Sequence, residues 1–253
     1  KKEYLNFIKS KLNRNITLKI INKKNSPTIV KRRYLDYISH NKIFGTYEMN
    51  DDELNTSQEK KLNKLITEEI KKHDLVIVSD YGHGFISKKI AKLLSKKSKY
   101  LALNAQINAA NIGFHTMRNY KGVNCVIINE KELRYEMRDK FGNIDDLSKK
   151  LMYKNIIKNL IVTRGTKGLS IYCLEKKKIT IMKCPAYANK IVDKIGAGDT
   201  VFSLISIFLS SKMPKDLSIF LASLGAALSV GRYANSNPIS KDQILNFAKY
   251  ILK

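Results

Sequence analysis

The sequence has few cysteines and no uninterrupted apolar segment of membrane-spanning length. Its three cysteines show neither metal-ligand nor paired spacing, and an odd number argues against a disulfide framework: Cys125, Cys173 and Cys184. We expect them to be small buried side chains in or near strands, in a reducing, cytoplasmic environment. Two apolar runs, residues 201–209 and 217–230, are separated by a segment that carries charges, so they predict buried helices and not membrane spans.

The first residues, Lys-Lys-Glu-Tyr, lack both an initiating Met and the apolar segment of a signal peptide.

Acidic residues are also scarce. The chain has 22 acidic residues against 47 lysines and arginines, a formal net charge of +25. The lysines form dispersed doublets that alternate with apolar residues at helical spacing, which is typical of solvated helix faces. Nucleic-acid binding is therefore an alternative that charge alone supports, whereas attraction of anionic sugars and acidic partners is expected.

Short apolar segments alternate with helical patterns through the middle of the chain. Strands are predicted at residues 73–80, 100–103, 125–128 and 160–163, followed by a hairpin of residues 169–174 and 178–183. This alternation predicts an α/β fold with a mainly parallel sheet, helices on both faces and ligands at the carboxyl ends of the strands. A chain of 253 residues with 43% apolar content is long enough for one such core.

A glycine turn precedes the apolar run at residues 201–209: Gly196-Ala197-Gly198-Asp199. A helix N-terminus presents unpaired backbone N–H groups, and glycines let an anion approach them, so this turn predicts a phosphate site. A second acid, Asp193, lies before the glycines, and two carboxylates around an anion site suit phosphoryl transfer. The alternative is that Asp199 only caps the helix.

The string Asp193-x-x-Gly196-Ala197-Gly198-Asp199-x-x-Phe202 resembles the C-terminal signature of the PfkB, or ribokinase-like, family of carbohydrate and nucleoside kinases. The resemblance implies a three-layer α/β fold with a mainly parallel central sheet and a small β lid. It also implies ATP and Mg²⁺ as cofactors, Asp199 as the catalytic base, and the amides of Gly196, Ala197 and Gly198 as the anion hole. Asp193 would position the loop at the substrate.

Further segments resemble the same family in the expected order. Residues 129–132 are similar to an Asn-x-x-Glu element, which implies that Asn129 and Glu132 organise Mg²⁺ and the nucleotide phosphates. The alternative is an ordinary helix start that Asn129 caps. Residues 163–168 are similar to a Thr-x-Gly-x-x-Gly stretch that lines the nucleotide, although a tight turn would need the same glycines; the residues implied are Thr163, Gly165 and Gly168.

The C-terminal residues 222–232 are similar to a small-residue helix that packs beside the adenine, which implies Ser223 as a nucleotide neighbour. Close packing of two helices by Gly and Ala is the equally physical alternative. The resemblance also admits a monovalent cation held by the loops around Asp193 and Arg232.

Two segments, residues 27–34 and 79–84, resemble those of heptose phosphate kinases that work in ADP-heptose synthesis and are often fused to a nucleotidyltransferase. This implies Asp80 as a substrate contact and residues 17–50 as a lid over the sugar. Lys31 and Arg33 are two residues apart, so on a strand they share one face and could bind a sugar phosphate. The alternative is a solvated basic edge that discourages aggregation.

Three departures accompany these matches. Lys194 stands where the subgroup usually has a small or apolar residue, and the amide-rich stretch 104–111 replaces an Asp-Pro-Lys type of sequence. The resemblance covers roughly residues 17–245, and the family's N-terminal third has no counterpart. We therefore expect a single, N-terminally truncated kinase domain over residues 1–253, with an apolar sheet edge that favours pairing with a partner.

The sequence thus predicts an ATP-dependent kinase for a sugar or sugar phosphate, with heptose 7-phosphate as the candidate acceptor. A homodimer and a fused or separate nucleotidyltransferase are the expected protein partners. The alternative is a noncatalytic domain that binds a nucleotide or sugar phosphate and regulates or scaffolds such a nucleotidyltransferase.

Overall fold

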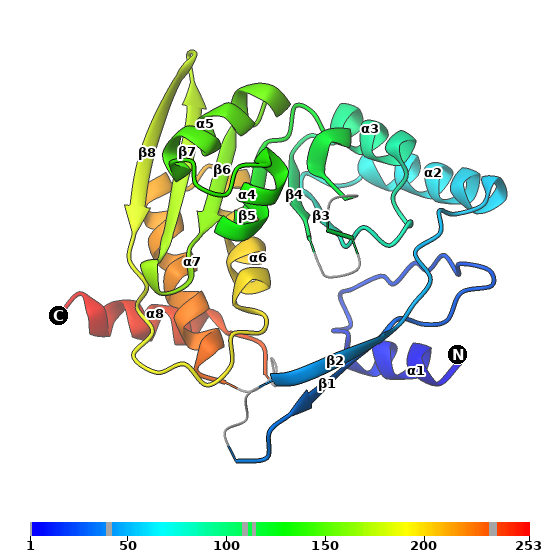
Figure 1. The fold of residues 1–253 in the computed structure, drawn as a ribbon, viewed down its shortest axis with the longest axis horizontal. Helices are drawn as coiled ribbons and strands as arrows, with labels where there is room; N and C mark the ends of the chain where they lie inside the picture. The colour runs from blue at the N-terminus through cyan, green and yellow to red at the C-terminus, as the bar shows by residue number, and fades with distance from the viewer. Residues whose placement is uncertain (1, 39–41, 108–110, 113–114, 233–236) are drawn as a thin grey trace. The chain divides into compact units, whose positions relative to one another are not determined.

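The computed structural model describes residues 2–38, 42–107, 111–112, 115–232 and 237–253 (Figure 1). The chain divides into two compact units, one of Lys1–Leu65 with His83–Ser87 and one of Ile66–Gly82 with Lys88–Lys253. Within the described ranges, no helix combines the length and the apolar character needed to cross a membrane.

The first unit contains helix α1 (Lys2–Lys11), an antiparallel ribbon of β1 (Val30–Leu35) and β2 (Lys42–Glu48), and most of α2 (Thr56–Ile70). The ribbon carries the strand expected near residues 27–34. Tyr34 stacks on Phe44 across the two strands, with ring centroids 4.3 Å apart. Helix α2 begins where Asn55 and Gln58 exchange side-chain and backbone hydrogen bonds of 2.9 and 3.3 Å.

The second unit contains a six-stranded sheet in the order β3-β4-β5-β6-β7-β8. The first four strands are parallel, and β7 and β8 continue antiparallel as the predicted hairpin. The strands are β3 (Val76–Asp80), β4 (Leu101–Ala105), β5 (Cys125–Asn129), β6 (Asn159–Thr163), β7 (Leu169–Glu175) and β8 (Lys178–Cys184). The expectation of a mainly parallel sheet is therefore confirmed.

Helices cover both faces of this sheet. They are α3 (Lys88–Lys97), α4 (Glu130–Met137), α5 (Ile144–Asn155), α6 (Ala197–Ser210), α7 (Lys215–Val230) and α8 (Lys241–Ile251). One core cluster joins Cys125 and Ile127 of β5 and Ile161 of β6 to Val201 and Ile205 of α6. Because side chains alternate between the faces of a strand, the intervening residues of β5 and β6 face the other layer, where α4 and α5 contact the same strands.

Three features of the sheet and its helices bear on predictions made from the sequence. All three cysteines are buried and free, as predicted. Gly225 lies in close contact with α6, because a Cβ there would approach Leu204 Cδ1 to 2.4 Å. The small residues of α7 thus serve close helix packing, the alternative that the sequence left open. Among the described residues β3 pairs only with β4, and Ile77 on this edge strand is 42% exposed.

Candidate active site

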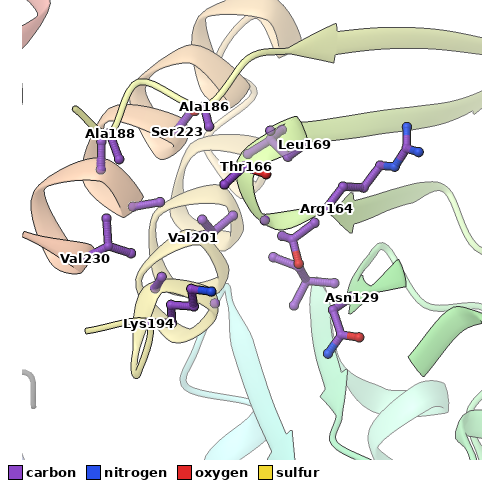
Figure 2. Close-up of a pocket in the computed structure, with 18 of the residues that line it drawn as sticks. Asn129, Arg164, Thr166, Leu169, Ala186, Ala188, Lys194, Val201, Ser223 and Val230 are labelled. Atoms are coloured by element: carbon purple, nitrogen blue, oxygen red, sulfur yellow. The ribbon is translucent and has the colours of Figure 1, made fainter. Parts of the chain in front are cut away.

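A cavity of about 600 Å³ lies in the second unit, at the carboxyl ends of the central strands (Figure 2). The ends of β4, β5 and β6 form one side, and α6 and α7 form the other. Its lining includes Asn104, Asn129, Glu132, Thr163, Arg164, Gly165, Gly168, Lys194, Ala197, Gly198, Asp199, Ser223, Ala226 and Val230. A cavity of this size suits a nucleotide-sized ligand, and its place at the strand ends is the one expected for α/β folds.

The glycine turn opens α6. Gly196 is the N-cap residue, with a left-handed φ of +85° and no side-chain cap, a conformation that glycine adopts without steric cost. The first intrahelical bond runs from Thr200 N to Gly196 O at 2.9 Å. The N–H groups of Ala197, Gly198 and Asp199 therefore lie outside the helical hydrogen-bond ladder. Two of these three residues belong to the predicted anion hole, and all three line the cavity.

Asp199 is the third residue of α6, three positions beyond the N-cap residue Gly196. Since Gly196 occupies the N-cap, the interpretation of Asp199 as a helix cap is wrong. Its carboxylate forms no hydrogen bond or ion pair with the described part of the chain, and it lines the cavity at an exposed position. Although the residue remains partly open to solvent, partial burial of its carboxyl group by the surrounding walls raises the pKa of Asp199, which makes this carboxylate a better proton acceptor.

Asn129 and Glu132 form a capping box at the start of α4. Asn129 Oδ1 accepts a hydrogen bond from Glu132 N, and Glu132 Oε2 accepts one from Asn129 N, both at 2.9 Å. Glu132 Oε1 accepts a third bond, from Ile107 N at 3.3 Å. Burial raises the pKa of Glu132, the backbone bonds oppose that shift, and the charge of Asp199 adds to it. The capping alternative is thus correct for Asn129, and both residues nevertheless line the cavity.

The donor set around the cavity fits Mg²⁺. Mg²⁺ is usually held by one or two carboxylates together with water and substrate phosphates. The lining supplies carboxylates from Glu132 and Asp199 and an amide oxygen from Asn129. Within the described ranges, no group of three His, Cys, Asp or Glu side chains could hold a metal by itself. Such a set needs ligand oxygens to complete the metal's coordination.

The turn after β6 forms a second wall. Arg164 N donates to Gly168 O at 2.8 Å, which closes a tight turn containing Gly165. Gly168 has a φ of +79°, and a Cβ at this position would lie 2.1 Å from Cys184 O. Glycine is therefore required here by both backbone angle and space. The turn that the sequence predicted is present, with Thr163 at its start.

An ion-pair chain that the sequence analysis missed holds this turn against α4. Glu130 accepts from Arg164 Nε at 3.0 Å and from Arg134 Nη2 at 3.1 Å. These bonds, the one from Arg164 first, lower the pKa of Glu130 despite its partial burial. The separation of 34 positions between Glu130 and Arg164 hides this contact from local patterns, although Glu130 and Arg134 have the spacing of a helical ion pair.

Helix α7 supplies the third wall. Ser223 is buried and its Oγ donates to Pro185 O at 2.7 Å, so this side chain fastens the segment after β8 to the helix. Ala226, Ala227 and Val230 add a small-residue surface on the same helix. Figure 2 shows Ser223 and Val230 on α7 facing the cavity from the side opposite Asn129.

Asp80 is enclosed and does not line the cavity. Its Oδ1 accepts from Gly82 N at 3.0 Å and its Oδ2 from Tyr120 Oη at 2.7 Å, and the residue is 6% exposed. His115 Nε2 lies 3.8 Å from the same carboxylate. Burial, followed by the Asp80 charge, raises the pKa of Tyr120. Both oxygens of Asp80 thus brace the turn after β3, and its contact with a sugar stays a prediction.

Asp193 braces the segment that leads into the glycine turn. Its Oδ1 accepts from Ile195 N at 3.0 Å, and its own N–H donates to Val230 O at 3.1 Å. A smaller hollow of about 420 Å³ lies on the other side of Asp199 and includes Arg232. Residues 233–236, next to Arg232, lie outside the described residues, and the monovalent cation stays a prediction.

Lys31 and Arg33 belong to β1 of the first unit, opposite Tyr47 and Gly45 of β2. The Lys31 ammonium lies 5.6 Å from the centre of the Tyr47 ring. Burial, and then the charge of Arg33, lowers the pKa of Lys31, as expected for two cations on the same face of a strand. Their binding of a sugar phosphate stays a prediction.

The amide-rich stretch 104–111 is partly described, since residues 108–110 lie outside the described ranges. Asn104 Nδ2 donates to Ile127 O at 3.0 Å. Asn111 Nδ2 donates to Tyr81 O at 3.0 Å and to Gln106 O at 3.1 Å. These two amides therefore hold the backbone at the strand ends. Of the residues of this stretch that the structure describes, Asn104 and Gln106 line the cavity.

Comparison with known proteins identifies the family of the chain. The model of the pfkB family of carbohydrate kinases matches residues 4–242. Bifunctional protein HldE from Campylobacter jejuni subsp. doylei is 29% identical over 203 residues, which cover 78% of this chain and 42% of that protein. HldE from Nitratiruptor sp. is 27% identical over 214 residues, which cover 83% and 43%. The chain thus spans less than half the length of these curated relatives.

Solved structures show the same fold. Ribokinase from Thermotoga maritima superposes with a TM-score of 0.66 at 18% identity, covering 88% of this chain and 70% of that one. Phosphofructokinase-2 from Escherichia coli, in complex with potassium, gives 0.65 at 14% identity, covering 83% and 67%. The six-stranded sheet with helices on both faces is therefore a ribokinase-like fold. The chain belongs to the pfkB family of carbohydrate kinases.

Proposed function

We propose that this chain transfers the γ-phosphoryl group of ATP to a hydroxyl of a sugar or sugar phosphate. The observation that carries the proposal is the juxtaposition of Asp199 with the uncommitted N–H groups of the first turn of α6, in one cavity. A proton acceptor and an anion-binding turn are the two elements that phosphoryl transfer requires of the protein. Membership of a carbohydrate kinase family supports the reaction class.

In the proposed mechanism the carboxylate of Asp199 and the N–H groups of α6 have separate roles. Asp199 accepts the proton of the acceptor hydroxyl as its oxygen bonds to the γ-phosphorus, and the bond from that phosphorus to the β-phosphate oxygen breaks, releasing ADP. The raised pKa of Asp199 favours this proton transfer. The N–H groups at the start of α6 bind the phosphoryl oxygens as their charge shifts. Thr163, the glycines at 165 and 168, and Ser223 form the walls of the nucleotide site.

A magnesium ion would be held beside the nucleotide by Glu132 and Asn129. When bound, such an ion neutralises charge on the phosphate oxygens. The capping box fixes both side chains at the start of α4, where both residues line the cavity. Glu132 is the stronger ligand of the two, because it carries a full charge when ionised.

For the acceptor we propose a phosphorylated sugar, with heptose 7-phosphate as the candidate. The likeness of residues 27–34 and 79–84 to heptose phosphate kinases supports this choice, as does the similarity to HldE over most of the chain. Lys31 and Arg33 supply two cations on one strand face for the phosphate. A nucleotidyltransferase, fused or separate, would then take the product, and a homodimer is the proposed assembly.

The experiment is an acceptor screen with ATP and Mg²⁺, using heptose 7-phosphate, fructose phosphates, unphosphorylated sugars and nucleosides. ADP release is followed together with the mass of the phosphorylated product. We expect the phosphorylated sugars to give the fastest turnover. Stabilisation by ATP in a melting assay, with no transfer to any acceptor, would contradict the proposal and favour the noncatalytic alternative.

A further inference from the structure

Four charged side chains line the main cavity, and they differ in what engages them: Glu132, Arg164, Lys194 and Asp199. The guanidinium of Arg164 is committed to Glu130 at 3.0 Å. Figure 2 shows Arg164 extending away from the α6 side of the cavity. Lys194, in contrast, forms no hydrogen bond or ion pair with the described part of the chain. It is therefore the lining cation that is available to a ligand.

Hydrogen bonds of the neighbouring residues fix the backbone position of Lys194. Its two neighbours are tied down, because Ile195 N donates to Asp193 Oδ1 at 3.0 Å and Asp193 N donates to Val230 O at 3.1 Å. The segment is therefore bonded to the last residue of α7 and leads directly into the N-cap of α6. Figure 2 shows the Lys194 side chain beside the first turn of that helix. A flexible ammonium thus shares one cavity wall with the amides that bind an anion.

The charges of the cavity explain why a cation is needed there. A nucleoside triphosphate brings several negative charges to a wall that already contains the carboxylates of Glu132 and Asp199. Repulsion between these charges is strong in a partly desolvated site. Within the described residues, Lys194 and Asp199 form no ion pair with each other, so Lys194 is not a counter-ion of that carboxylate. The Lys194 ammonium is therefore available to pair with a phosphate group of the nucleotide.

On the basis of the proposed function, we propose that the Lys194 ammonium binds the γ-phosphate of the nucleotide. It stays in contact with this phosphoryl group while the group is transferred to the acceptor. Lysine suits this role because it is a compact charge on a flexible stem with three donors. The resemblance places a small or apolar residue at this position, so the contact distinguishes this chain from the heptose phosphate kinases it resembles. ADP, which lacks the γ-phosphate, should not depend on Lys194.

The test compares the variants Lys194→Met and Lys194→Arg with the control Lys190→Met. Lys190 is an exposed lysine on the same segment and does not line the cavity, so its loss gives the same change in net charge. Affinities are measured calorimetrically for ADP and for the non-hydrolysable β,γ-imido analogue of ATP, with Mg²⁺. Turnover is measured with the best acceptor.

We expect Lys194→Met to weaken binding of the ATP analogue about tenfold, to change ADP binding less than about twofold, and to lower kcat/KM about tenfold to a hundredfold. Lys194→Arg should recover part of the loss, and Lys190→Met should match wild type. Equal losses for ADP and the analogue, or equal losses in both Met variants, would overturn the assignment.

The result also separates this inference from the proposed function. If wild-type protein phosphorylates an acceptor and Lys194→Met behaves as wild type, the inference is wrong and the proposed function holds. If wild-type protein phosphorylates nothing and the ATP analogue still depends on Lys194 while ADP does not, the proposed function is wrong and the γ-phosphate contact holds.

Discussion

The cavity of the second unit and the β1–β2 ribbon of the first unit contain the two sets of predicted functional residues, and they are built differently. The cavity residues follow strands and helices of a buried core, and main-chain bonds fix the turns that carry them. The ribbon has only two strands, and most side chains of β1 are exposed. A two-stranded ribbon is marginally stable by itself.

Because they are built differently, the two regions suit different tasks, catalysis in the cavity and acceptor recognition on the ribbon. Phosphoryl transfer needs donors and acceptors held to within a fraction of an ångström, which a core-supported turn provides. Recognition of a phosphate by long cationic side chains tolerates more movement. We therefore expect changes in the second unit to affect nucleotide binding and turnover, and changes in the ribbon to affect acceptor choice.

The largest effect is expected from Gly168→Ala. The new Cβ would lie 2.1 Å from Cys184 O at a φ of +79°, so the turn must shift, at a cost of about 2–4 kcal/mol in the free energy of unfolding. Denaturant unfolding measures this cost. Gly165→Ala is the matched control, because it has a φ of +59° in the same turn and nothing within 4 Å of its Cβ, so only about 1 kcal/mol is expected. Equal costs would refute the steric argument.

A second prediction concerns the ribbon. The double variant Lys31→Met, Arg33→Met should raise the KM for a phosphorylated acceptor about tenfold to a hundredfold, because two cations on one face are lost. The KM for ATP should stay within about twofold. Arg32→Met is the control, since it lies between them on the other face of β1. A comparable rise for an unphosphorylated acceptor would assign the pair to general packing instead of phosphate recognition.

A smaller effect is expected from the ion pair at the nucleotide wall. Glu130→Gln removes the charge that holds both Arg164 and Arg134. Because all three side chains are partly exposed, we expect only about 0.5–1 kcal/mol in stability and a KM for ATP raised a few-fold. Steady-state kinetics check this, with Lys167→Gln, an exposed position in the same turn, as control. An unchanged KM would show that the turn holds its shape without the pair.

The smallest effect is a pH dependence at Glu132. Its folded pKa is raised above 4.5, so the folded state binds the proton more tightly, and this stability is present below pH 4.5 and lost as pH rises through the folded pKa. Glu132→Gln keeps a capping residue and removes the buried charge. We expect it to unfold at slightly higher denaturant concentration than wild type at pH 7, and to lose that advantage near pH 4. A variant less stable at pH 7 would contradict this sign.

Local patterns in the sequence predicted much of this molecule. The strands, the hairpin, the apolar helix after residue 200 and the glycine turn all have signals within a few residues. The family resemblance then brought Asn129, Thr163 and Ser223 to one site, and the structure places these residues around one cavity. A sequence can predict a site at the carboxyl edge of a parallel sheet, because parallel strands end on the same side of the sheet.

The remainder depends on contacts between distant segments. The link between Glu130 and Arg164, and the enclosure of Asp80 by Tyr120, join residues 34 and 40 positions apart. No periodic pattern encodes such pairs. The capping interpretation of Asp199 failed for a different reason: the helix begins at Ala197, because Gly196 adopts the left-handed conformation that starts it. Element boundaries of this kind depend on single backbone angles.

The role of Asp199 as the catalytic base is tested by the variant Asp199→Asn, assayed for acceptor-dependent ADP release and, by calorimetry, for ATP binding. Asparagine has nearly the same shape but cannot accept the hydroxyl proton as a base. We expect turnover to fall at least about a thousandfold while the Kd for ATP stays within a few-fold of wild type. Turnover within tenfold of wild type would contradict the assignment of Asp199 as the base.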